Sequence, residues 1–265
     1  MELIQLEAWE LGVAAALVVA LALLSLPLRL ELARSLLVSG SRMVLQLLLV
    51  GLILETLFES RHPLLMAVMA LVMLAVAARE VMARQERRLV GWWGYGLGAV
   101  AMFVSSFTMV LLALTIIVRP EPWWTPQYAV PMLGMLLGNT MTGIALALDR
   151  LNQGAWEQRL QIETRLTLGY TAAGAITDLR RRAARAGMVP TINAMAAAGV
   201  VSLPGMMTGQ ILAGSPPLEA VKYQILILFL IIAGVGLGTL AAVWMGAKRL
   251  FDERERLRLD RLQGS

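Results

Sequence analysis

The sequence contains no cysteine, a single histidine and only two lysines in 265 residues. Without cysteine the chain can form neither disulfides nor thiolate metal sites, and cysteine-based catalysis is excluded. The histidine, His62, precedes Pro63, and we interpret it as a solvated loop residue. Neither Lys222 nor Lys248 lies in a GxxxxGK[ST] pattern, so the chain has no phosphate-binding loop. If ATP drives this protein, the ATPase is therefore another subunit, and the sequence implies no cofactor.

Charged residues are also scarce. They make up 15% of the chain, against about 25% in soluble domains, whereas 58% of the residues are hydrophobic. This composition is typical of a membrane protein with several spans. The net charge of +5 does not indicate nucleic-acid binding, because the basic residues lie between apolar segments, where orientation in a membrane accounts for them.

Seven segments are apolar and long enough to form a membrane helix, which needs roughly 20 residues. The N-terminal sequence MELIQLEAWELG carries Glu2, Glu7 and Glu10 and no basic residue, unlike a cleaved signal peptide, so we expect the first span to be retained. The predicted spans are Leu11–Leu28, Leu36–Phe58, Pro63–Ala78, Trp93–Val118, Gln127–Leu148, Thr191–Ala213 and Ala220–Ala247.

The basic residues predict the orientation. If alternate loops share a side, 20 of the 23 lysines and arginines fall on one side, which is a strong positive-inside signal. It places the N-terminus outside and the C-terminus in the cytoplasm. The cytoplasmic side receives Arg29, Arg34, Arg42, Arg79, Arg84, Arg87, Arg88, seven arginines of a central polar stretch and six basic residues of the tail; the other side receives Arg61, Arg119 and Lys222.

The central polar stretch, residues 149–190, is the longest break in the apolar sequence, and we predict a cytoplasmic loop of two short helices. The first has Trp156, Leu160 and Leu166 on one face and ends at Gly169. The second is capped by Thr171 and closed by Gly187 with Pro190; its apolar face is Ile176, Leu179, Ala183 and Ala186. An alternative is a helix pair held at the interface by lipid headgroups.

The fifth and sixth spans carry unusual polar residues. Asn139 is ten residues from Asp149, so it lies about 15 Å into the membrane. Pro204 predicts a kink or break in the sixth span, and such breaks are typical of transport sites. The pathway residues that we predict here are Asn139, Thr142, Met206, Met207, Thr208 and Gln210. The alternative is close helix packing through the GxxxG pairs Gly134–Gly138 and Gly205–Gly209.

Three further features allow more than one interpretation. Glu55 lies in the apolar run LILETLF and is either a functional carboxylate or an interface residue. The methionines of the irregular spans either bind soft ions or fill gaps between helices. The charged tail, residues 248–265, predicts a solvated helical segment in which Asp252 and Arg256 form an i,i+4 pair.

Three motifs together resemble the FetB-like (UPF0014) family of ABC-transporter permeases, which is associated with iron export and related to plant aluminium-tolerance permeases. They are MLGMLLGNTMTGIALALDRL, PTINAMAAAGVVSLPGMMTGQILAG and PLEAVKYQ. The resemblance implies a seven-span permease of the inner membrane, with two copies pairing with two copies of a separate ATP-binding-cassette protein.

Within the polar stretch, Glu163 and Gly169 stand six residues apart and resemble the start of the EAA loop that docks ABC permeases on their ATPase. Thr164 and Arg165 replace the two alanines of that motif. The resemblance therefore implies a docking region, in which we include Glu163, Leu166, Gly169, Arg180 and Arg181.

These observations predict an all-α, polytopic protein that forms a single permease domain and is not itself an enzyme. The expected mechanism is alternating access, driven by an ATPase pressing on the polar stretch. One alternative is a gradient-driven transporter or channel that uses Glu55 as its titrating group. Another is a membrane scaffold whose basic loop and tail bind partners without transport.

Overall fold

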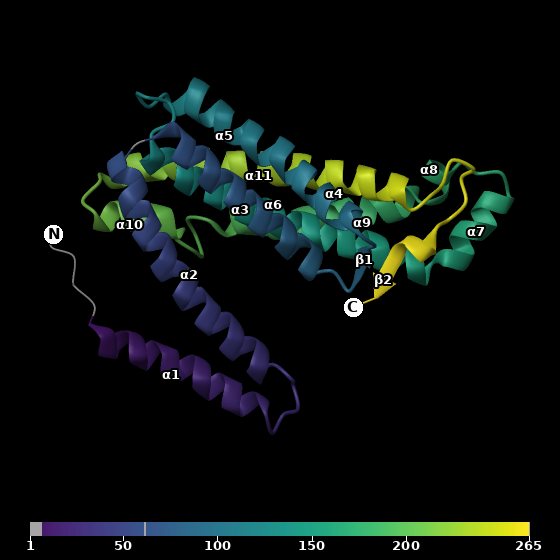
Figure 1. Ribbon diagram of the computed structural model, residues 1–265, viewed down its shortest axis with the longest axis horizontal. Helices are drawn as coiled ribbons and strands as arrows, with labels where there is room; N and C mark the ends of the chain where they lie inside the picture. The colour runs from purple at the N-terminus through teal and green to yellow at the C-terminus, as the bar shows by residue number, and fades with distance from the viewer. Residues whose placement is uncertain (1–6, 61, 265) are drawn as a thin grey trace. The chain divides into compact units, whose positions relative to one another are not determined.

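A computed structural model describes residues 7–60 and 62–264 of the chain (Figure 1). The chain forms two compact units, Met1–His62 with Leu212–Gly214 and Pro63–Ile211 with Ser215–Ser265. Two residues used in the charge arguments, Glu2 of the acidic N-terminal sequence and Arg61 of the basic residues, lie outside the described residues.

The first unit contains two helices, α1 (Ala8–Ser25) and α2 (Ala33–Ser60), which pack against each other. The acidic N-terminus caps α1, because the backbone N–H of Glu7 donates to the Glu10 carboxylate at 2.8 Å. The helix ends at Ser25, three residues before the predicted Leu28, since Pro27 restricts the backbone that precedes it.

The second unit contains the remaining elements. Its long helices are α3 (Pro63–Ala83), α6 (Pro126–Glu157), α9 (Thr177–Ala197) and α11 (Pro217–Arg249). The fourth predicted span is a composite of α4 (Trp92–Met102), η1 (Phe103–Phe107), α5 (Thr108–Leu112) and η2 (Ala113–Val118), in which η1 and η2 are π-helical. The short elements are α7 (Arg159–Thr167), α8 (Ala172–Ala175), α10 (Gly205–Leu212), η3 (Leu259–Arg261) and the antiparallel strands β1 (Arg87–Leu89) and β2 (Leu262–Gly264).

The helices confirm a polytopic all-α membrane protein. In the described part of the chain, five helical segments are long and apolar enough to cross a membrane, and each overlaps a predicted span. They are Ala33–Glu59, Pro63–Ala83, Trp92–Val118, Pro126–Glu157 and Pro217–Arg249. A shorter apolar helix, Trp9–Ser25, corresponds to the first predicted span. The count of seven spans stays a prediction, as does the placement of the N-terminus outside and the C-terminus in the cytoplasm.

The sixth predicted span is not one helix. Its first part is the end of α9, which stops at Ala197, and its second part is α10, which begins at Gly205 after an irregular segment. The break predicted at Pro204 is therefore confirmed, although the helix already ends seven residues earlier. The chain turns at Gly199, whose φ of 84° favours glycine over other residues.

The end predicted for the second loop helix, at Gly187 and Pro190, is wrong. α9 passes through both residues and continues to Ala197. Its buried face, Leu179, Ala183, Gly187 and Thr191, recurs every three or four residues on both sides of the proline. Packing of this face against α6 and α11 outweighs the backbone hydrogen bond that a proline removes.

The fifth predicted span also continues beyond its expected end at Leu148, since α6 extends to Glu157. Its polar residues find partners after α3: the Asp149 carboxylate accepts the Glu86 N–H at 2.8 Å, and the Asn152 amide donates to the Gln85 side chain at 3.1 Å. Both ends of the polar stretch are thus helical, and Trp156 belongs to α6 rather than to the first loop helix.

Backbones approach very closely where α6, α9 and α11 meet. A Cβ added to Gly187 of α9 would overlap the Gly143 carbonyl oxygen of α6 and lie 2.8 Å from Cγ2 of Thr239 on α11. A Cβ on Gly143 would lie 2.9 Å from the Gly187 carbonyl oxygen. A Cβ added to Gly238 of α11 would lie 2.7 Å from Cγ2 of Thr140 on α6. These positions require glycine because α6 and α9 touch through their backbones and because threonine side chains fill the space between these helices and α11.

The tail is not the helix that the sequence predicts. After α11 the chain reverses, burying Leu250 and Phe251, and returns through η3 to pair β2 with β1. The predicted Asp252–Arg256 ion pair is present at 2.8 Å, but it stabilises a turn. Hydrogen bonds from the backbone N–H and side chain of Arg256, opposed only partly by burial, lower the pKa of the Asp252 carboxyl below its ordinary value.

Three basic segments that are distant in the sequence meet at one end of the second unit. β1 pairs with β2, and the Arg87 guanidinium lies 4.1 Å from the centroid of the Trp156 ring at the end of α6. Figure 1 shows β1, β2, α7 and α8 at this end of α6 and α11. Arg119 and Lys222 lie near the other helix ends, after η2 and early in α11. The arrangement agrees with the alternation used in the charge count.

The close contact at Gly187 predicts that alanine lowers the stability of the protein at this position but not at Gly209. Gly187→Ala should lower the thermal unfolding midpoint in detergent, because backbone overlap in a packed core costs about 1–3 kcal/mol. Gly209→Ala on α10 introduces the same methyl group where no atom lies within 4 Å, and it should leave the midpoint unchanged or raise it slightly. Equal shifts in the two variants would contradict the assigned packing.

Candidate coupling hairpin and transport pathway

The segment between α6 and α9, residues 158–176, forms a helical hairpin made of α7 and α8. α7 follows α6 after one residue, Gln158, and ends as predicted at Gly169, whose φ is 88°. Thr171 caps α8 as predicted, since its hydroxyl accepts the Gly174 N–H at 3.2 Å. The sequence therefore identified the turn of the hairpin correctly.

Arginines brace this hairpin against the long helices. Arg165 on α7 donates to the Ala175 carbonyl at 3.0 Å and reaches the Asp178 carboxylate at 3.4 Å. Arg182 on α9 donates to the Gln158 side chain at 2.9 Å. Ile162, rather than the predicted Leu160, is the buried apolar residue of α7. These contacts join α7 to α8 and tie the hairpin to α9.

Three of the predicted docking residues share one cavity. Glu163, Leu166 and Gly169 line a space of about 610 Å³ whose other wall is the tail, residues 254–257. The Glu163 side chain is exposed, so it is accessible to a partner. The tail, for which the sequence predicts a solvated helical segment and, in the scaffold alternative, a docking site, is therefore part of this surface.

The other two docking residues lie elsewhere. Arg180 lines a separate cavity of about 340 Å³ with Trp244 and Lys248, and its buried Nε has no hydrogen-bond partner among the described residues. Arg181 is exposed on α9. The structure thus joins Glu163, Leu166 and Gly169 and separates them from this arginine pair.

Two predicted pathway residues lie on one exposed face of α6. Asn139 is exposed, and its amide donates to the Met135 carbonyl at 2.8 Å, while its side-chain oxygen remains accessible. One turn further on, Thr142 receives a hydrogen bond of 3.3 Å from Arg84 at the end of α3. With Gly138, also exposed, these residues form what we call the polar strip of α6.

The remaining pathway residues lie on α10. The Thr208 hydroxyl donates to the Pro204 carbonyl at 3.3 Å, and the buried Oε1 of Gln210 has no partner among the described residues. Met206 and Met207 are partly buried, and Met206 packs against the core. None of these residues lines the cavities described above, so the structure does not join α10 to the polar strip.

Glu55 is exposed on α2, which belongs to the first unit. Within residues 7–60 and 62–264, no three His, Cys, Asp or Glu side chains are grouped so that they could hold a metal ion. Any metal ion that binds transiently would therefore rely on amide, hydroxyl or thioether groups, such as those of the polar strip and α10.

The sequence analysis missed a group of buried hydroxyls beside the glycine contacts. Those of Ser106, Thr140 and Thr239 are fully enclosed, and none has a hydrogen-bond partner in the described part of the chain. Ser106 lies in η1, and π-helical turns often mark functional sites. The signal was present in the sequence, as hydroxyl residues in the middle of the fourth, fifth and seventh predicted spans.

Comparisons with known proteins agree with the resemblance found in the sequence. The model of the uncharacterised protein family UPF0014 matches residues 8–251. The UPF0014 membrane protein slr1647 of Synechocystis is 40% identical over 94% of both chains. The "Probable iron export permease protein FetB" of Escherichia coli is 30% identical over 96% of both chains.

A plant protein is also similar. Protein ALUMINUM SENSITIVE 3 of Arabidopsis thaliana is 33% identical over 88% of this chain and 84% of its own. No solved structure matches the chain significantly. Because the family model covers nearly all of the sequence and these relatives match along most of their length, the chain belongs to the UPF0014 family of membrane proteins.

Proposed function

We propose that this protein is the membrane-spanning permease subunit of an ABC transporter, which exports a metal ion across the inner membrane using ATP hydrolysed by a separate subunit. The chain has no phosphate-binding loop, so a separate subunit would have to hydrolyse the ATP. Iron is the first candidate substrate because the relative FetB is named a probable iron export permease.

The observation that carries this proposal is the mechanical continuity of the hairpin with the helix core. The α7–α8 hairpin extends directly from α6 and leads into α9, and these two helices touch through Gly143 and Gly187. Arg165 of α7 reaches Asp178 of α9, and Arg182 of α9 donates to Gln158 between α6 and α7, so both contacts join the hairpin to α9. A force applied to the exposed hairpin would therefore move α6 and α9 directly, because no flexible loop separates the hairpin from these helices.

In this mechanism the ATPase binds the surface formed by Glu163, Leu166 and Gly169, with Arg180 and Arg181 of α9 nearby in the sequence. Nucleotide binding brings two ATPase subunits together and pushes the hairpins, which tilts α6 and α9 as one body. Alternating access follows when this tilt opens the pathway on one side of the membrane and closes it on the other.

The polar strip supports a pair of permease chains. An exposed amide within a membrane helix is costly against lipid, so such groups usually face protein or a water-filled cavity. We propose that the strips of two copies face each other and line the pathway. Their amide and hydroxyl oxygens are ligands that suit hard metal ions, and Gln210 and Thr208, with Met206 and Met207, would contribute further groups from the broken span.

Docking on the hairpin predicts a partner that depends on Glu163. Purification of the chain from native membranes in mild detergent should recover a stoichiometric P-loop ATPase. Glu163→Arg should reduce this recovery by about tenfold or more, because a misplaced charge at an interface costs several kcal/mol. Glu121→Arg, a matched reversal before α6 and thus at its opposite end, should retain the ATPase.

The absence of an ATPase from both the native and the Glu121→Arg preparations would reject the ABC assignment. A gradient-driven transporter would then be the remaining candidate, and Glu55→Gln would test it in ATP-free vesicles. Recovery of the ATPase with Glu163→Arg at the native level would instead show that docking uses another surface.

The lack of native cysteine makes the proposed pairing of strips directly testable. Asn139→Cys introduces the only thiol, and oxidation should yield a disulfide-linked dimer, because the two Cα atoms must approach within about 7 Å. Leu237→Cys, which is 51% exposed on α11, should remain monomeric. No dimer from Asn139→Cys, or equal dimer from both variants, would contradict the pairing.

The pathway assignment predicts a loss of transport when its amides are removed. Asn139→Ala and Gln210→Ala should each lower ATP-dependent metal transport into inverted vesicles by about tenfold, the effect expected for losing one contact to a charged group. Thr108→Ala removes an exposed polar group of α5 and should leave transport unchanged. Unaltered transport by both folded amide variants would show that the pathway lies elsewhere.

A further inference from the structure

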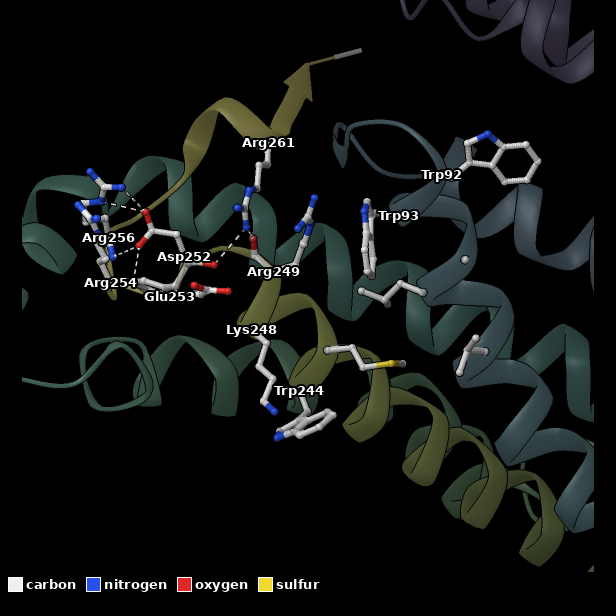
Figure 2. Close-up of a pocket in the computed structure, with 15 residues that line it drawn as sticks. Trp92, Trp93, Trp244, Lys248, Arg249, Asp252, Glu253, Arg254, Arg256 and Arg261 are labelled. Carbon is white, nitrogen blue, oxygen red and sulfur yellow. Dashed lines mark hydrogen bonds and ion pairs between the residues drawn. The ribbon is translucent and has the colours of Figure 1, made fainter.

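The largest cavity that we describe in the second unit lies where α11 ends; none of the predicted pathway or docking residues lines it, although it shares residues with the two cavities that Glu163 and Arg180 border. It has a volume of about 1,100 Å³ and is bounded by the start of α4, the last turns of α11 and the tail (Figure 2). None of these residues entered the predictions made for transport. All of them belong to one compact unit.

The cavity has an apolar side and a basic side. Trp93, Leu97, Val100 and Met245 come from the apolar parts of α4 and α11, whereas Lys248 and Arg249 form the charged end of α11. Figure 2 shows the two tryptophans Trp92 and Trp93 on one side and the basic residues nearer the tail. A molecule that fills this space needs both an apolar and a negatively charged part.

The positive charge of the cavity is not neutralised internally. Five basic and two acidic residues line it, and one of the acidic residues, Asp252, is already paired with Arg256 at 2.8 Å and Arg258 at 3.9 Å. Lys248 and Arg249 have no carboxylate partner in the described part of the chain; instead they lie 3.9 Å and 4.5 Å from the ring centroids of Trp244 and Trp93. The cavity therefore attracts an anion.

Arg261 strengthens this arrangement. Its guanidinium donates to the backbone carbonyls of Arg249 at 2.9 Å and Phe251 at 3.1 Å. These bonds fix a third positive charge beside the last turn of α11 without consuming a carboxylate. Such a rigid group of cations favours a ligand that can accept several hydrogen bonds, as a phosphate does.

The tryptophans place this cavity at the membrane surface. Trp92 and Trp93 are 85% and 58% exposed, and Trp244 is 50% exposed, although all three border charged residues. Indole rings concentrate at the headgroup level of membranes because one edge is polar and the rest is apolar. A free inorganic anion would satisfy the basic side but leave the apolar side uncovered.

We propose that this cavity binds an anionic phospholipid from the adjacent leaflet. The phosphate lies against Lys248, Arg249 and Arg261, and the acyl chains cover Leu97, Val100 and Met245. Basic pockets at helix ends recognise anionic headgroups in this manner. Its occupation links α4, α11 and the tail.

Quenching of tryptophan fluorescence by brominated lipids tests this inference. The whole chain is placed in nanodiscs of phosphatidylcholine with increasing fractions of brominated phosphatidylglycerol. Native protein should be quenched at lower fractions by phosphatidylglycerol than by brominated phosphatidylcholine. The double variant Lys248→Gln with Arg249→Gln should lose this preference, corresponding to about tenfold weaker binding. The matched control Arg150→Gln with Arg185→Gln removes two exposed charges elsewhere and should keep it.

A second variant keeps the proposal testable if the double variant fails to fold. Val100→Phe leaves every charge in place and adds no tryptophan, but it fills the apolar side; it should weaken the preference for phosphatidylglycerol, while inorganic phosphate has no effect. Equal quenching by both lipids in the native protein, or an equal loss in the control, would overturn the proposal. Relief of quenching by millimolar glycerol phosphate would assign the site to a soluble phosphate, and a protein that co-purifies and blocks quenching would assign it to that partner.

Discussion

The contact between the backbones of α6 and α9 at Gly143 and Gly187 is the constraint on which the rest of the second unit depends. Because neither residue has a Cβ, the two helices approach until carbonyl oxygens meet the opposite backbone, and Thr239 of α11 closes the third side. Close packing holds the helices together at this contact, because no room is left for a side chain between the two backbones. Helix α9 continues through Pro190 because this contact holds it in place.

Local sequence was sufficient to predict the elements whose cause is local. Apolar composition located the five long spans, Gly169 marked the end of α7, Thr171 marked a cap, and Pro204 marked a break. Each of these signals acts within a few residues of its position. The alternation of basic segments was also informative, since those of the second unit meet at one end in the structure.

The sequence failed where distant partners decide the conformation. α6 continues past Leu148 because Asp149 and Asn152 bond to the segment after α3, about 65 residues earlier. The tail departs from a helix because Asp252 accepts two backbone N–H groups and because β1 offers a strand to pair with. The spacing of charged residues along the sequence indicates neither the bonds of Asp149 and Asn152 nor the pairing of the tail with β1. For the same reason it could not show that Thr140 and Thr239 are enclosed.

The tail borders both of the proposed binding surfaces. Arg254 and Arg256 border both the docking cavity of the hairpin and the basic cavity at the end of α11, and Asp252 fixes the turn that carries them. A displacement of the hairpin against α11 must therefore alter the shape of both cavities. If a bound lipid changes the affinity of the hairpin for its partner, the bound partner must change the affinity of the cavity for the lipid by the same factor, because coupling between two binding sites is reciprocal.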